Sequence, residues 1–330
     1  MVKAGGFCVD TPMKRFALVI LTAGLIWGIG AGCSNTPSAK RATALPQSPS
    51  GTITSLVDTV GHHLILKRYP QRIVSCAPSI TEILYKLGLQ NRLVLDTTAC
   101  DYPPEAKQKP HFNALSNDIE PILAQNPDLV IDIKDLNHNL LAPLQKAGVP
   151  QLTIDVSSVK AVLSSILLLG EATGTSQQAQ ALVQSLQAKL NAVRTAVAKA
   201  PHRPRVLILY GTNPLYTTGP NSFINDLITI AGGVNVVAKP PPGNVISPEE
   251  AVALQPEVIL CAPELVPAIR QMPGWAQAVP AVRNNRFFTA IDTLERPGPR
   301  MADAVVALAR YLHPHEMAHF NRSALVRTAP

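Results

Sequence analysis

The five residues from His315 to His319 read H-E-M-A-H, which fits the H-E-x-x-H signature of zinc proteases. On a helix this spacing places both histidines on one face as zinc ligands and leaves Glu316 as the general base. A catalytic site would need a third ligand, but the residues after His319 include no acid, histidine or cysteine. Pro314 also interrupts the start of the required helix. We therefore predict no enzyme, no cofactor and no metal site, and keep a zinc metallohydrolase as a minor alternative.

Two glutamates, Glu120 and Glu249, occupy matching positions in two similar segments of the sequence, which form an internal repeat. Residues 120–131 and 249–260 each place a glutamate in the first turn of a predicted helix, then a proline seven residues later, then an acid and an apolar strand. Two matching units, one in each half of the chain, place one carboxylate at a corresponding position on each. Acids also stabilise the positive end of a helix dipole by a few tenths of a kcal/mol, roughly. On the residues alone, this local role is the simpler interpretation.

Residues 175–200 predict one long helix, because apolar residues recur every three or four positions and form a continuous stripe. The pair Thr175 and Gln178 is a capping-box pattern at its start, and Pro201 marks its end. A helix of this length between two α/β-patterned segments predicts a stiff bridge between two lobes. The alternative is a surface helix of one large domain. The stripe consists of Ala179, Leu182, Val183, Leu186, Leu190, Val193 and Val197.

Short apolar strands alternate with helices on both sides of the long helix, a pattern typical of parallel α/β structure. We expect an α/β fold with two Rossmann-like lobes joined by one long α-helix. Within the N-terminal lobe, Ser79 and Glu82 form a second capping-box pair near the start of a helix over 78–87. The expected division is an N-terminal α/β lobe over 52–156, linking helices over 157–201, a C-terminal α/β lobe over 202–318 and a tail over 319–330.

The expected secondary structure can be given strand by strand and helix by helix. A hairpin pairs 53–57 with 63–66, and further strands cover 72–75, 93–95, 129–133, 152–154, 206–210, 234–237, 258–261 and 287–290. Besides 78–87 and 175–200, helices cover 157–172, 223–231, 248–254 and 301–312.

The composition is typical of a globular protein, and the charge pattern is not that of a nucleic-acid-binding protein. Of the 330 residues, 46% are hydrophobic and 15% are charged. The formal net charge of +7 is not gathered into a stripe or interleaved with aromatic residues. We therefore predict no nucleic-acid partner.

The N-terminus predicts export. Lys14 and Arg15 precede an apolar run over 16–32 that ends in small residues before Cys33, as in a secretory signal. The run is too short and too rich in glycine for a comfortable membrane span. Residues 1–32 are therefore assigned to a signal peptide, and Met13 is a candidate for the true start. Gly30-Ala31-Gly32-Cys33 resembles a bacterial lipobox, which implies lipidation of Cys33; a plain cleaved signal is the alternative.

Residues 33–51 then form a lipid-anchor cysteine and a flexible tether rich in Ser, Pro, Thr and Ala. We expect a protein in the periplasm or at the cell surface, held to the membrane through this cysteine. Three cysteines remain in the body, Cys76, Cys100 and Cys261. Export permits one disulfide, with Cys76–Cys100 the first choice, but three unpaired thiols are equally compatible with the sequence.

Four motifs carry a family resemblance: residues 72–88 (RIVSCAPSITEILYKLG), 100–104 (CDYPP), 213–219 (NPLYTTG) and 296–300 (RPGPR). Together, and in this order across residues 52–315, they resemble the substrate-binding proteins of cobalamin, haem and iron-siderophore ABC importers, the class III periplasmic binding proteins. The resemblance implies two α/β lobes joined by one long helix, a small-molecule ligand between them, and delivery to a dimeric permease by a monomeric receptor. It also implies that Glu120 and Glu249 dock into arginine pockets of the two permease subunits.

The cobalamin branch is the closest match. Tyr216 matches an aromatic residue that packs on the corrin ring, and Asp292 and Arg296 match polar residues at the amide edge of that ligand. The tryptophans of cobalamin receptors are missing, so a haem or a ferric siderophore is the alternative ligand, and a bare metal ion is a minor one. The helix that starts near Pro78 and Ser79 offers N–H groups to the cleft. The expected ligand-binding residues are Pro78, Ser79, Cys100, Tyr102, Tyr216, Asp292 and Arg296.

Overall fold

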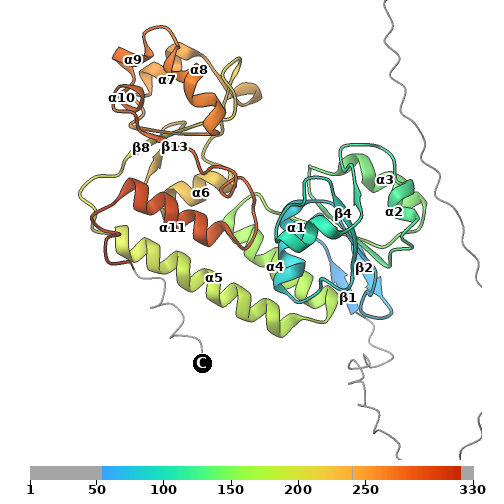
Figure 1. Ribbon diagram of the computed structural model, residues 1–330. Helices are drawn as coiled ribbons and strands as arrows, with labels where there is room; N and C mark the ends of the chain where they lie inside the picture. Colours follow the sequence, from blue (N-terminus) through green and yellow to red (C-terminus); the bar gives the residue numbers. More distant parts are fainter. Residues whose placement is uncertain (1–53, 240, 321–330) are drawn as a thin grey trace, which may run out of the picture. The chain divides into compact units, whose positions relative to one another are not determined.

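Two parallel β-sheets connected by a pair of long helices form the body of the protein (Figure 1). The computed structural model describes residues 54–239 and 241–320, and all of these belong to one compact unit, Ser48–Pro330. The predicted signal peptide over 1–32, Cys33 with its tether, and residues 321–330 of the predicted tail lie outside the described residues.

The N-terminal lobe is built on five parallel strands in the order β5-β4-β3-β6-β7. Counted along the chain this order is 3-2-1-4-5, as in a Rossmann sheet. An antiparallel hairpin, β1 (Thr54–Val57) with β2 (His63–Leu66), precedes the sheet. The other elements of this lobe are β3 (Ile73–Ser75), α1 (Pro78–Lys86), β4 (Leu93–Thr97), η1 (Pro104–Gln108), β5 (His111–Phe112), α2 (Glu120–Leu123), β6 (Leu129–Ile133), α3 (His138–Lys146) and β7 (Gln151–Ile154).

The C-terminal lobe is built on four parallel strands in the order β10-β8-β12-β13. A separate two-stranded antiparallel pair, β9 with β11, follows the carboxyl end of β8. The elements of this lobe are β8 (Arg205–Leu209), β9 (Leu215–Tyr216), α6 (Phe223–Ile230), β10 (Val234–Asn235), η2 (Pro242–Asn244), β11 (Val245–Ile246), α7 (Pro248–Ala253), β12 (Val258–Cys261), η3 (Pro263–Leu265), α8 (Val266–Arg270), α9 (Trp275–Ala278), α10 (Pro280–Arg283), β13 (Phe287–Phe288) and α11 (Met301–Leu312).

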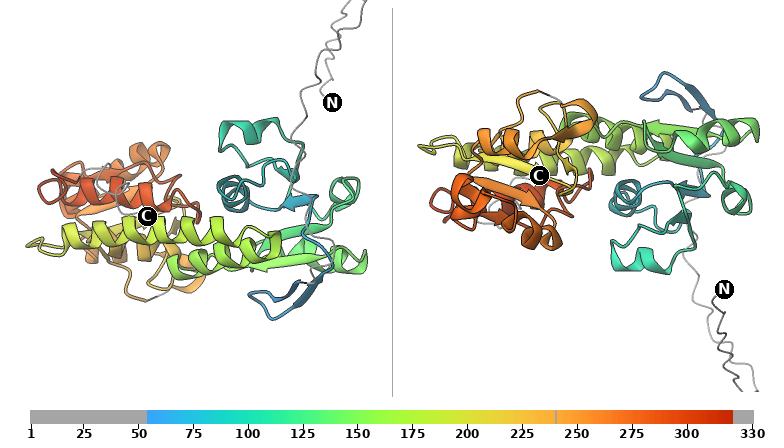
Figure 2. Two further views of the ribbon diagram at one scale, coloured as in Figure 1. Left: turned by 90° about the horizontal axis from the view of Figure 1, so that it is seen from below. Right: turned by 90° about the horizontal axis from the view of Figure 1, so that it is seen from above.

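Two linking helices, α4 (Val159–Thr173) and α5 (Ser176–Val197), lie side by side (Figure 2). The first N–H of α4, from Val159, donates to Asp226 of the C-terminal lobe at 2.9 Å. At the other end of α4, Arg92 of the N-terminal lobe donates to the Thr173 carbonyl, also at 2.9 Å. From there α5 returns across α6 and α11. Both helices therefore reach from one lobe to the other.

The prediction of one long helix is confirmed, because α5 runs unbroken for 22 residues, or about 33 Å. Its buried side chains belong to a core that also contains Ile73 of the first sheet and Val206 of the second. The linking helices are closely packed: a Cβ placed on Gly170 would lie 2.4 Å from the Cβ of Ala179. A shared core and close helix packing give the connection between the lobes its stiffness.

Along a strand, successive side chains pack into hydrophobic cores on opposite faces of the sheet. Ile73 of β3 packs in the core that contains α1 and the linking helices, whereas Val74 packs in a second core with Ile122 of α2 and Leu140 of α3. Both faces of the sheet are covered, which explains why β6 is buried along its whole length. The near-continuous apolar runs seen in the sequence are the signature of this arrangement.

Two local predictions are wrong. Neither expected capping box forms: Thr175 shares a hydrogen bond with Thr173 through their hydroxyls, and α1 begins after Ala77 with no side-chain cap. The H-E-x-x-H segment is not helical, because α11 ends at Leu312 and residues 314–319 form turns. Its histidines therefore lack the helical face that a zinc site of this kind requires.

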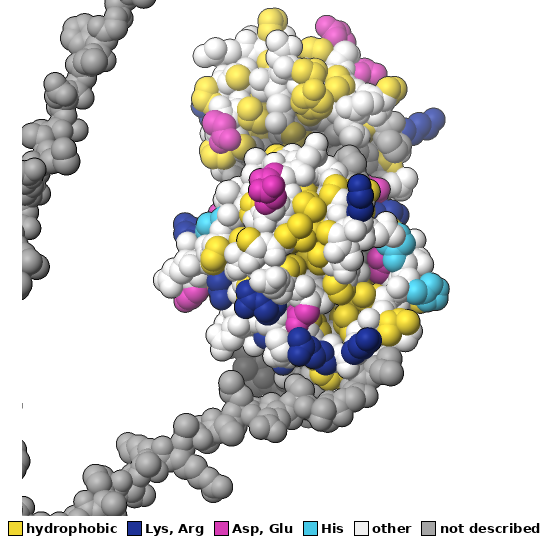
Figure 3. Space-filling view, turned by 90° about the vertical axis from the view of Figure 1, so that its right-hand side faces the viewer, with side chains coloured by type: hydrophobic (Ala, Val, Ile, Leu, Met, Phe, Trp, Pro, Cys, Tyr) yellow, Lys and Arg dark blue, Asp and Glu magenta, His cyan; other side chains and the backbone are white. Residues whose placement is uncertain are grey.

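The surface gives no sign of a charged stripe on the face shown in Figure 3, where basic side chains are interspersed with acidic and hydrophobic ones. No helix within residues 54–239 and 241–320 is both long and apolar enough to cross a bilayer.

Candidate ligand-binding cleft

Ligands of open α/β sheets bind beyond the carboxyl ends of the strands, where the strand order reverses. In the N-terminal lobe this point lies between β3 and β6, and the chain leaving β3 leads directly to Pro78 and Ser79. In the C-terminal lobe it lies between β8 and β12, and the chain leaving β8 leads to Tyr210. The topology thus directs these segments to the region where a cleft between the lobes is expected.

The loop over residues 291–300 reaches from the C-terminal lobe to the N-terminal lobe. Its Arg300 donates two hydrogen bonds to Glu82 of α1, at 2.6 and 3.0 Å, and its guanidinium lies 4.1 Å from the ring centroid of Tyr102. The Glu82 side chain is only 2% exposed. This hydrogen bonding raises the pKa of Arg300 above its ordinary value. The residue expected to cap α1 locally instead ties that helix to the other lobe.

A second bridge joins the same two segments. Arg296 donates to both carboxylate oxygens of Asp101, one of them at 3.0 Å. These hydrogen bonds lower the pKa of Asp101 below its ordinary value. Between the two arginines, the backbone of Gly298 lies against Ser79, since a Cβ there would be 3.6 Å from Ser79. The structure therefore brings together three predicted residues, Ser79, Tyr102 and Arg296.

Cys100 does not face the cleft, although it was expected among the ligand-binding residues. Its side chain is buried, and its sulfur lies 3.3 Å from the hydroxyls of both Thr81 and Thr97. Burial raises the pKa of the Cys100 thiol above its ordinary value, which disfavours the reactive thiolate. Of the two possibilities that the sequence left open, the structure has three unpaired thiols and no Cys76–Cys100 disulfide: both of these cysteines are free and buried, as is Cys261.

Tyrosines are prominent among the exposed large apolar side chains. Tyr102, Tyr210 and Tyr216 are 36%, 42% and 46% exposed. Tyr210 and Tyr216 are neighbours, because the Tyr210 N–H donates to the Tyr216 carbonyl at 2.9 Å. Tyr210 was missed in the sequence, although its place directly after a strand of a parallel sheet is the signal that could have identified it.

Tyr210 also lines a pocket of about 390 Å³ beside the bridging loop, together with Phe223, Leu294, Glu295 and Pro297. Burial raises the pKa of Glu295 above its ordinary value, and the neighbouring charges of Asp292 and Glu264 raise it further. Asp292 is exposed. The C-terminal wall therefore combines aromatic rings with carboxylates.

The two matching glutamates occupy matching local structures. Glu120 is the first residue of α2 and Glu249 the second of α7, and both are exposed. Each helix is followed by a residue with positive φ, Asn126 at 46° and Gln255 at 44°. In each lobe the next strand pairs with the first strand of its sheet. The internal repeat is therefore a repeat of structure as well as of sequence.

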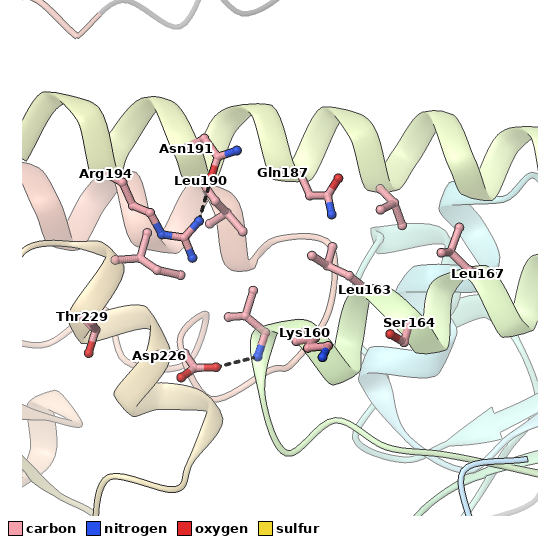
Figure 4. Close-up of a pocket in the computed structure, with 13 residues that line it drawn as sticks. Lys160, Leu163, Ser164, Leu167, Gln187, Leu190, Asn191, Arg194, Asp226 and Thr229 are labelled. Atoms are coloured by element: carbon pink, nitrogen blue, oxygen red, sulfur yellow. Dashed lines mark hydrogen bonds between the residues drawn. The ribbon is translucent and has the colours of Figure 1, made fainter.

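A larger cavity, about 550 Å³, lies elsewhere, between α4, α5 and α6 (Figure 4). Lys160, Gln187 and Arg194 line it, but none of the expected ligand-binding residues does. Within the described part of the chain no group of three or more His, Cys, Asp or Glu side chains could hold a metal ion.

Comparisons with known proteins place the chain in a family. The periplasmic binding protein family matches residues 73–293. Over 293 residues the chain is 29% identical to the uncharacterized ABC transporter substrate-binding lipoprotein YvrC of Bacillus subtilis strain 168, spanning 86% of this chain and 93% of the relative. It is 29% identical to a vitamin B12-binding protein of Vibrio cholerae serotype O1 over 255 residues, which is 76% of this chain and 92% of that one.

A solved structure gives the same result. The periplasmic heme-binding protein RhuT from Roseiflexus sp. RS-1, in its apo form, superposes with a TM-score of 0.66 and 31% identity, covering 74% of this chain and 99% of RhuT. These relatives are solute-binding proteins and not enzymes, so the zinc-hydrolase alternative has no support. The chain belongs to the periplasmic binding protein family, and it is an ABC transporter substrate-binding protein of the vitamin B12, haem and siderophore group.

Proposed function

We propose that this protein captures a corrinoid between its two lobes and delivers it to the permease of an ABC importer. The observation that carries the proposal is the set of exposed tyrosines beside the interlobe bridges, Tyr102 on one lobe and Tyr210 with Tyr216 on the other. Aromatic faces offer large apolar area to a flat macrocycle, while the tyrosine hydroxyls remain available for hydrogen bonds. Tyr216 packs on the ring, and Asp292 and Arg296 contact the polar edge of the ligand. Pro78 and Ser79 supply the N-terminal rim.

Release of the ligand requires a permease. We infer that Glu120 and Glu249 dock with arginines on the two subunits of a permease dimer, because exposed carboxylates in repeated local structures present the same group twice. A monomeric receptor, exported by the segment over 1–32 and anchored through a lipid on Cys33, would meet the permease at the membrane. The lipoprotein relative from Bacillus subtilis supports the anchor.

Isothermal titration calorimetry with cyanocobalamin tests the ligand. The proposal expects binding of one molecule per protein with a Kd well below ~100 μM, a free energy of about −5.5 kcal/mol or better. Absence of binding up to ~100 μM would refute the corrinoid assignment. A haem is the second candidate, because RhuT, a heme-binding protein, is 31% identical. Haemin and a ferric siderophore titrated in parallel show which member of the group is preferred.

The docking proposal has a separate test. A Glu120→Ala/Glu249→Ala variant should lose transport of the ligand into cells or proteoliposomes while its ligand affinity stays unchanged. Glu171→Ala, which removes an exposed carboxylate from α4, is the matched control and should transport normally. A fall in ligand affinity of the double variant would place these glutamates in the ligand site instead.

A further inference from the structure

The bridging loop carries two arginines, and both are already neutralised by carboxylates of the N-terminal lobe. Arg300 is bound by Glu82 through two hydrogen bonds, and Arg296 is bound by Asp101 through two more. Arginine is the side chain best suited to hold a carboxylate of a ligand, because its planar fork matches the two oxygens. In this protein the guanidinium groups of Arg296 and Arg300 are both already hydrogen-bonded to carboxylates of the protein itself.

The other ionisable groups of the loop are acidic. Among the described residues, Asp292 and Glu295 have no side-chain hydrogen bond or ion pair with another residue. Glu295 lines the pocket beside Tyr210, and its pKa is raised chiefly by burial. A carboxylate of a ligand approaching this wall therefore meets two acids and two paired arginines.

We propose that Asp101 is a specificity-determining residue, which occupies Arg296 and so disfavours macrocycles with free carboxylates relative to macrocycles with carboxamides. This inference rests on the proposed function, since it concerns the ligand of the same cleft. It divides the candidates by chemistry: a corrinoid carries amides at its edge, whereas haem carries two propionates.

The two kinds of group interact differently with the pair. A propionate can take both N–H groups that Arg296 now gives to Asp101 only by displacing Asp101, which exchanges one carboxylate for another. At an unused guanidinium N–H the propionate lies beside the Asp101 carboxylate, which is a like charge. An amide can join the pair without breaking it. Its carbonyl accepts from an unused guanidinium N–H, and its NH₂ donates to a free lone pair of Asp101. Asp101 is also the exposed member of the pair, with 51% of its side chain accessible, so a ligand can reach it.

Asp101→Asn tests the inference, because it keeps the size of the side chain and removes its charge. The probes are haemin and its dimethyl ester, which share one ring and differ in the carboxylates, and cyanocobalamin. Affinities are measured by absorbance titration and calorimetry on the mature protein. We expect haemin to bind Asp101→Asn about tenfold more tightly than wild type, while the ester changes by less than about twofold. The ratio of haemin affinity to cyanocobalamin affinity should rise accordingly.

Two further variants test whether the gain in haemin affinity depends on Arg296. Adding Arg296→Gln to Asp101→Asn should reverse the gain, because the released arginine is then missing. Glu171→Gln removes the same charge far along α4 and should leave every affinity unchanged. The inference is overturned if haemin affinity of Asp101→Asn stays within twofold of wild type or is unmeasurable. An equal gain for the ester, or a gain that survives Arg296→Gln, also overturns it.

The outcome is separable from that of the proposed function. If wild type fails to bind cyanocobalamin while Asp101→Asn gains haemin affinity, the corrinoid assignment falls and the role of Asp101 stands. If wild type binds cyanocobalamin and Asp101→Asn gains nothing, the assignment stands and the role of Asp101 falls.

Discussion

Replacing Arg300 by methionine should destabilise the protein more than removal of an ordinary surface cation. Glu82 is 2% exposed and receives two hydrogen bonds from Arg300, so Arg300→Met leaves a buried carboxylate without its cation. Breaking a buried ion pair in this way costs about 3–5 kcal/mol. The Arg300 side chain is 20% exposed, so water will reach the vacated site, and the lower end, about 3 kcal/mol, is expected. Loss of the contact with the Tyr102 ring contributes to this cost.

The assay is urea unfolding followed by circular dichroism, with free energies of unfolding compared between variants. Glu82→Met/Arg300→Met should recover part of the loss, because apolar side chains in place of both ions remove the unpaired charge. Lys189→Met is the matched control. It breaks the pair between α5 and Asp303, whose side chain is 48% exposed, and should cost less than about 1 kcal/mol. The reasoning is refuted if Arg300→Met costs no more than Lys189→Met, or if the double variant is as unstable as Arg300→Met.

Three other outcomes follow from buried groups. Burial raises the pKa of Asp132 to about 7, and the nearby Thr153 hydroxyl offsets only part of this effect. The folded state therefore keeps a proton that the unfolded chain releases near pH 4, so Asp132 should lower the stability between about pH 4 and 7, by at most about 4 kcal/mol. Burial also raises the pKa of Asp96 to about 6, so Asp132→Asn should make this slope in urea titrations shallower and leave the part due to Asp96. Gly170→Ala should lower the free energy of unfolding by about 2 kcal/mol, because its Cβ meets Ala179 at 2.4 Å; unchanged stability would disprove the close packing of α4 on α5. The three body cysteines are free and buried, so a thiol reagent should modify them only after unfolding; a reactive thiol in the native protein would contradict this.

Long or strongly apolar elements were predictable from the sequence. The bounds of β6, β12 and α11 agree with the predicted ranges to the residue, because each has a clear apolar pattern of the right length. The small β9–β11 pair was not predicted. Its strands have two residues each, too few for any periodicity, and 28 residues separate them.

The sequence predicted which segments form the site, but it did not predict which residues of those segments pair with one another. The motifs singled out the chain around Tyr102 and the loop with Arg296, and the structure brings these two segments together. The partners, however, lie far apart in sequence: Arg296 is 195 residues from Asp101, and Arg300 is 218 from Glu82. A local pattern assigned Glu82 to a helix cap, because the competing arginine belongs to the other lobe.

The burial of Cys100 could not be predicted from its sequence motif either. Its neighbours Asp101 and Tyr102 are exposed, whereas its own side chain turns inward to Thr81 and Thr97. In an irregular segment the side-chain direction follows from tertiary packing, so a motif can locate the segment without showing which of its residues faces the ligand.

The position of a bound corrinoid tests the account most directly. Crystals of the protein grown with cyanocobalamin, measured at the cobalt absorption edge, locate the metal of the ligand by its anomalous signal. The account predicts one cobalt peak between the lobes, flanked by Tyr102 and Tyr216, with α5 still a single unbroken helix. A peak in the cavity lined by Lys160 and Arg194 between the linking helices and α6, or a ligand held by one lobe alone, would contradict it.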